Sequence, residues 1–111
     1  GPALLVDGLI NPDIDVSKVR EYVWFTETSQ PFTPPSSAHP YFLGNHDDTS
    51  LFFEYEPDRV TSLDREYLAS IPAECAASSY IIYADTCLLS EEELRSLNIM
   101  FKKIPRDITR L

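Results

Sequence analysis

An uninterrupted apolar run constrains the fold of this chain more than any other feature. Residues 80–84 read Tyr-Ile-Ile-Tyr-Ala, without the polar alternation of a strand that has one face in water. Such a run is typical of a central strand buried on both faces, as in parallel sheets covered by helices. A chain of 111 residues is long enough for one core of this kind, so we expect residues 1–111 to form a single domain.

Helices and strands are predicted to alternate on both sides of this run. The apolar periodicity and the turn residues give the order β-α-β-β-α-β-α-β. This order predicts an α/β fold, a small open mixed sheet with helices packed on it. We expect an antiparallel hairpin at 41–56 and parallel β-α-β units in the second half. The predicted strands are 3–6, 41–43, 51–56, 80–84 and 99–104, and the predicted helices are 16–28, 62–71 and 91–97.

Polar residues indicate where these helices begin and end. Asp15 and Thr61 are placed to cap the first two helices by accepting hydrogen bonds from their free amide groups. Ser90 and Glu93 have the spacing of a capping box, in which each side chain bonds the other residue's backbone N–H. Asn98 suits the left-handed position that ends the third helix. The segment 29–40 is rich in Pro and Ser, cannot continue a helix, and is expected to be a loop.

Charge is distributed unevenly along the chain. The net charge is −9, yet the C-terminal segment is basic. Its four cations stand against the single acid Asp107, a balance of +3, so the first 101 residues carry −12. An acidic body is repelled by phosphate, which disfavours nucleic-acid binding over the surface as a whole. Candidate DNA contacts are therefore confined to the tail, and they are Lys102, Lys103, Arg106 and Arg110. The alternative is that these residues are ordinary solvated surface cations.

The first helix carries the candidates for a partner interface, Tyr22, Trp24 and Phe25. Trp24 falls on an otherwise polar face, where a tryptophan is suited to anchor a protein contact. The alternative is that the loop 29–40 covers it, and the helical spacing does not choose between the two. At 100° per residue, one side of this helix is expected to face the hydrophobic core. This core stripe consists of Val16, Val19, Tyr22 and Val23, and Phe25 lies at its edge.

No cluster of side chains predicts catalysis. His46-Asp47-Asp48, together with Glu54 and Glu56, has the residue types of a divalent-metal cluster. Polar residues are expected at the tip of a hairpin in any case, so a turn is the preferred interpretation. Asp85-Thr86-Cys87 follows the buried strand, at the edge where open α/β sheets bind ligands. No glycine-rich loop accompanies it, and its polar groups are better suited to bond loop and helix-start amides. We therefore predict no catalytic, cofactor-binding or metal-binding residue in this chain.

Two cysteines, Cys75 and Cys87, do not indicate a disulfide-rich secreted protein. We expect free thiols, with a disulfide as the alternative. The sequence has no apolar run of about 18 residues and no signal peptide, so we expect a cytoplasmic protein without a membrane partner. The Gly1-Pro2 start fits a native sequence or a protease-cleavage remnant, and in both cases we expect a C-terminal domain cut from a larger protein.

Three segments resemble the C-terminal region of bacterial site-specific DNA methyltransferases, in particular the modification subunits of type III restriction systems and their relatives. The segments are GPALLVDGLINP at 1–12, YVWFTET at 22–28 and IMFKKIP at 99–105. The resemblance extends over nearly the whole chain as a general pattern and includes no short diagnostic motif. It implies that the parent transfers a methyl group from S-adenosylmethionine to a base amino group, usually adenine N6, after flipping the base out.

The family's Asp/Asn-Pro-Pro-Tyr motif and its Gly-containing cofactor motif are absent from this chain, whose nearest string is Thr33-Pro34-Pro35-Ser36. The resemblance therefore implies a noncatalytic C-terminal domain that serves assembly or the placement of DNA and partners. S-adenosylmethionine is then bound by the parent and not by this fragment. The implied partners are the rest of the methyltransferase, a second modification subunit or a restriction subunit, and DNA through the parent. The alternative is a free-standing acidic protein-interaction or regulatory module.

Overall fold

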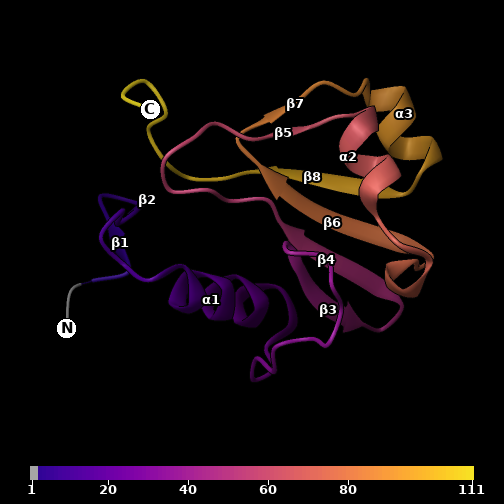
Figure 1. Cartoon of the computed structure of the whole chain (residues 1–111), viewed down its shortest axis with the longest axis horizontal. Coiled ribbons are helices and arrows are strands. Elements are labelled where there is room, and N and C mark those ends of the chain that lie inside the picture. The colour runs from indigo at the N-terminus through magenta and orange to yellow at the C-terminus, as the bar shows by residue number, and fades with distance from the viewer. Residues whose placement is uncertain (1–2) are drawn as a thin grey trace.

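A four-stranded mixed sheet forms the centre of the fold, with helices on both of its faces (Figure 1). The computed structural model describes residues 3–111, so the question of a native or remnant Gly1-Pro2 start lies outside the described residues. The sheet has the order β3-β4-β6-β8, antiparallel between β3 and β4 and parallel elsewhere. This arrangement confirms the small open α/β fold. The strands are β3 (Phe42–His46), β4 (Thr49–Phe53), β6 (Ser79–Ala84) and β8 (Ile99–Lys103).

The apolar run that predicted a central strand is β6, which lies between β4 and β8. Its side chains alternate between two hydrophobic cores. Ile82 and Ala84 are fully buried in the core on one face, whereas Ile81 and Tyr83 pack against the core on the other. Because both faces of the strand are covered, the run needs no polar positions.

One helix covers the first face of the sheet and two cover the second (Figure 1). On the first face, α1 (Val16–Thr28) packs Val19 and Val23 against side chains of β3 and β4. On the second face, α2 (Arg65–Ser70) and α3 (Glu91–Ser96) cover a core that includes Phe52 and Ile82. Within residues 3–111, no helix is long and apolar enough to cross a membrane.

Two of the predicted helix starts are confirmed. Asp15 accepts a hydrogen bond from the Ser17 amide at 2.8 Å and caps α1. Ser90 and Glu93 make both hydrogen bonds of the capping box at the start of α3, each at 3.1 Å. Asn98 has a φ of 55°, the left-handed conformation predicted for the residue after this helix.

The predicted start of α2 at Thr61 is wrong. Asp64 caps this helix instead, by accepting a hydrogen bond from the Tyr67 amide at 2.7 Å. The Thr61 hydroxyl is buried, donates to the Glu54 carbonyl at 2.6 Å and accepts from the Asp85 amide at 3.2 Å, so it bonds other segments of the chain and not a helix start. The two residues that follow Thr61 form a short strand, β5 (Ser62–Leu63), which pairs in parallel with β7 (Thr86–Cys87). A short 3₁₀ turn (Ala73–Cys75) follows α2, and both cysteines are free.

Two hairpins differ from the predicted boundaries because pairs of residues adopt positive φ angles. The expected strand at 3–6 is reduced to β1 (Leu5–Val6), which pairs with β2 (Leu9–Ile10) across a turn at Asp7 and Gly8. The hairpin of β3 and β4 likewise turns at Asp47 and Asp48, with φ angles of 50° and 62°. Two consecutive left-handed residues make the tight turn that suits strand twist. The strands β3 and β4 therefore run closer to the tip than predicted.

Candidate functional site

The partner-interface candidates on α1 lie in two different environments. Tyr22 and Phe25 are exposed, with 41% and 57% of their surface open to solvent. They are three residues apart and therefore neighbours on the helix surface. Trp24 is buried, with 8% of its surface exposed. The predicted core stripe is thus wrong at Tyr22, and the actual buried side chains on the helix include Trp24.

Trp24 is covered by the loop that follows its helix, which was the second of the two alternatives. Its indole Nε1 donates a hydrogen bond to the Pro31 carbonyl at 3.1 Å, and its ring packs against Phe32. On the sheet side the ring lies against Gly44, where an added Cβ would approach it to 2.9 Å. A side chain enclosed by its own loop and strand is not available to anchor a partner.

The most buried of the candidate DNA contacts, Arg106, forms an internal ion pair with Asp85. Its Nε and Nη2 donate to the two carboxylate oxygens at 2.9 and 2.7 Å. The side chains are only 7% and 0% exposed. Further guanidinium hydrogen bonds reach the carbonyls of Glu56 and Arg59. Arg106 is therefore committed to holding the C-terminal segment on the body, which disfavours it as a DNA contact.

Asp85 lies at the strand end that was considered as a ligand site, and its carboxylate accepts hydrogen bonds from groups within the chain. The Thr61 amide donates to its carboxylate at 2.8 Å, and Arg106 completes the set. Burial would raise the pKa of Asp85, but the hydrogen bonds from Arg106 and Thr61 outweigh it and hold the pKa below the ordinary value. As the sequence favoured, these polar groups serve the loops around them.

The other tail cations are distributed between internal contacts and solvent. Lys102 Nζ lies 2.7 Å from a carboxylate oxygen of Glu27 on α1, which also accepts a hydrogen bond from the Tyr83 hydroxyl. Lys103 Nζ donates to the Asp85 carbonyl at 2.9 Å. Arg110 is exposed. At least three of the four candidate DNA contacts thus have partners within the chain.

The acidic tip at His46-Asp47-Asp48 is a turn, as its position in the hairpin indicated. The Asp47 carboxylate lies 3.3 Å from His46 Nε2 and is well exposed. Over residues 3–111, no group of three or more His, Cys, Asp or Glu side chains is arranged to hold a metal ion.

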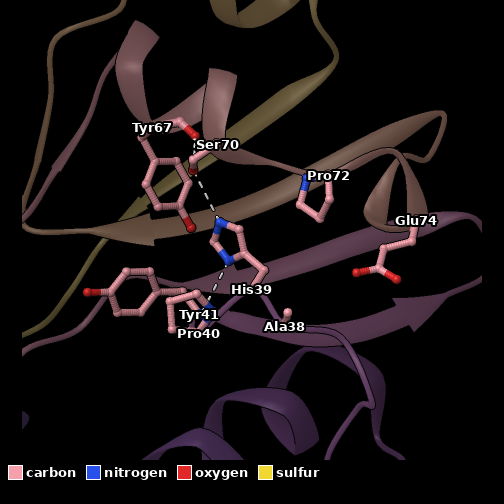
Figure 2. Close-up of a pocket in the computed structure, with 8 residues that line it drawn as sticks. All are labelled: Ala38, His39, Pro40, Tyr41, Tyr67, Ser70, Pro72 and Glu74. Atoms are coloured by element: carbon pink, nitrogen blue, oxygen red, sulfur yellow. Dashed lines mark hydrogen bonds between the residues drawn. The ribbon is translucent and has the colours of Figure 1, made fainter.

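A cavity of about 480 Å³ opens between the loop before β3 and helix α2 (Figure 2). Three rings gather at one side of it: His39 lies 6.1 Å from Tyr41 and 5.6 Å from Tyr67, measured between ring centroids. Burial and hydrogen bonding to Glu56 raise the pKa of Tyr41 to about 12. The cavity is lined by Ala38, His39, Pro40, Tyr41, Tyr67, Ser70, Pro72 and Glu74.

The His39–Ser70 pair in this cavity is not arranged as a base and a nucleophile. His39 Nε2 lies 3.3 Å from the Ser70 hydroxyl, but that hydroxyl donates its own proton to the Tyr67 carbonyl. Nδ1 accepts from the Tyr41 amide at 3.3 Å, so the remaining ring proton is on Nε2 and points to Ser70 (Figure 2). Burial lowers the pKa of His39, which favours this neutral form. The imidazole is a donor to Ser70 and does not activate it.

Sequence reasoning missed a second cavity, of about 390 Å³, which shares Tyr67 and Ser70 with the first. Glu54 and Tyr67 are among the residues that line it. The Glu54 Oε2 atom and the Tyr67 hydroxyl are both buried and have no hydrogen-bond partner. Burial, followed by the charge of Asp64, raises the pKa of Glu54 to about 7. The available signal was a single acid inside the apolar run Leu51–Tyr55, which the sequence alone marked only as a residue of metal-ligand type and not as part of a site.

Comparisons of the chain with family models, curated proteins and solved structures found no match.

Proposed function

We propose that this chain is the noncatalytic C-terminal domain of an S-adenosylmethionine-dependent, site-specific DNA methyltransferase of a bacterial restriction-modification system. The residues that support the methyltransferase assignment are the three segments at 1–12, 22–28 and 99–105. The parent protein acts in the cytoplasm and most often methylates adenine N6. The role of this domain is to contact another domain or subunit of the enzyme.

One observation carries the assembly role: the adjacent exposed aromatic side chains of Tyr22 and Phe25 on α1. Exposed tyrosine and phenylalanine are enriched at the centres of protein interfaces, because they bury a large area at low entropic cost. Direct DNA placement has less support, since Arg106 and Lys102 are paired with Asp85 and Glu27. A body carrying −12 in its first 101 residues also opposes phosphate.

The assignment predicts that the isolated chain neither binds S-adenosylmethionine nor transfers its methyl group. Isothermal calorimetry with the cofactor should give no binding signal, and tritiated cofactor should leave no label on duplex DNA. The complete protein that contains the chain should methylate the same DNA. Micromolar cofactor binding by the isolated chain would contradict the proposal that the rest of the parent protein, and not this domain, binds S-adenosylmethionine. A complete protein without methyl transfer would favour the free-standing acidic module.

A further inference from the structure

Two buried polar atoms without partners lie beside the same cavity, beneath the start of α2. They are Glu54 Oε2 and the Tyr67 hydroxyl, and both residues line the cavity of about 390 Å³. Glu54 is 7% exposed and Tyr67 is 8% exposed. A buried polar atom left unpaired costs roughly 1–3 kcal/mol, so native proteins rarely retain two together without a function or a bound group.

The charges around this cavity favour a cationic occupant. Three acids line it, Glu54, Asp64 and Glu66, against the single cation Arg59. Arg59 is engaged elsewhere, because its Nη2 donates to the Tyr41 hydroxyl at 3.0 Å and lies 3.8 Å from a Glu56 oxygen. Burial and then the charge of Asp64 raise the pKa of Glu54, while Arg59 acts in the opposite direction. A further cation bound beside the carboxyl group would lower that pKa.

We infer that this cavity binds a guanidinium group, with Glu54 as the carboxylate partner and the Tyr67 hydroxyl as a second acceptor. A guanidinium presents five donors in a rigid plane and so can serve two acceptors at once. It also stacks favourably on the faces of tyrosine rings. The source is either a free arginine-like molecule or an arginine side chain of a protein. The inference is independent of the proposed methyltransferase role.

Calorimetry at pH 8, where Glu54 is largely ionised, tests this site. N-acetyl-arginine amide should bind at least about 10-fold more tightly than the neutral isostere N-acetyl-citrulline amide, because charge-assisted hydrogen bonds are the stronger class. Glu54→Gln should remove this preference, and Tyr67→Phe should weaken it several-fold. Glu92→Gln removes the same charge from an exposed position on α3 and should leave the preference unchanged.

Equal affinities of the unaltered chain for the two amides would overturn the inference, and so would an unchanged preference in a folded Glu54→Gln variant. Thermal unfolding of each variant establishes that it is folded. The source of the group follows from a third ligand, the peptide Gly-Gly-Arg-Gly-Gly. Binding at least about 10-fold tighter than the amide identifies a protein side chain as the natural occupant. Affinity equal to or below that of the amide identifies a free small molecule.

Discussion

Replacing Arg106 with methionine should destabilise the chain by about 3–5 kcal/mol, the usual cost of removing one partner of a buried ion pair. The substitution leaves the Asp85 carboxylate, which has no exposed side-chain surface, without its bidentate partner. It also removes the donors that reach the Glu56 and Arg59 carbonyls. Urea unfolding at pH 7, compared with the unaltered chain, measures this loss.

Two comparisons isolate the ion pair in that experiment. Arg110→Met removes the same charge from an exposed position and should change the free energy of unfolding by no more than about 0.5 kcal/mol. The double variant Asp85→Asn, Arg106→Met should lose less than the sum of the single changes, since the two side chains interact directly. A loss below about 1 kcal/mol in Arg106→Met would contradict a stabilising role for this pair.

The pH dependence of stability gives the same pair a second signature. The pKa of Asp85 is lower in the folded chain than its ordinary value of 3.8. The unfolded chain therefore takes up the proton first as the pH falls. The stability that Asp85 contributes is present in full above its unfolded pKa. It is lost as the pH falls below about 3.8 and through the lower, folded value.

Trp24→Ala should destabilise the isolated chain by about 3–5 kcal/mol, the range for emptying a buried site of a large aromatic residue. The loop loses its hydrogen bond from Nε1 to Pro31, and the space between Phe32 and Gly44 is left unfilled. Thermal or urea unfolding measures the change. Phe25→Ala, one position along the same helix but 57% exposed, is the matched control and should cost no more than about 0.5 kcal/mol. Equal losses in the two variants would contradict the burial assigned to Trp24.

Local chemistry explains which parts of the fold were predictable. The Ser90–Glu93 capping box and the run that became β6 each depend on neighbouring residues, and both were confirmed. Trp24 fell outside the predicted core stripe, and its burial was left open, because a helical projection assumes that only the sheet buries the helix. The loop after α1 adds a second covering surface that no periodicity reveals. Thr61 has the chemistry of a helix cap, but its partners Glu54 and Asp85 are 7 and 24 residues away.

The same limit applies to the candidate site residues. The basic tail was considered for DNA because its cations outnumber its acids locally, but Lys102 pairs with Glu27, which is 75 residues earlier in the chain. Arg106 pairs with Asp85 across 21 residues. Charge counted along the sequence does not show such pairs, because they form only when the folded chain brings distant segments together. The cavity between Glu54 and Tyr67 is unpredictable for the same reason.

Sedimentation of the complete protein with its partner subunit tests the assembly role of α1 most directly. The protein carrying Tyr22→Ser and Phe25→Ser should associate at least about 30-fold more weakly, which corresponds to about 2 kcal/mol, the threshold for a hot spot. Both side chains are exposed in the isolated chain, so its unfolding midpoint should stay nearly unchanged. Association as strong as that of the unaltered protein, with the fold intact, would contradict the proposal that this helix surface serves assembly.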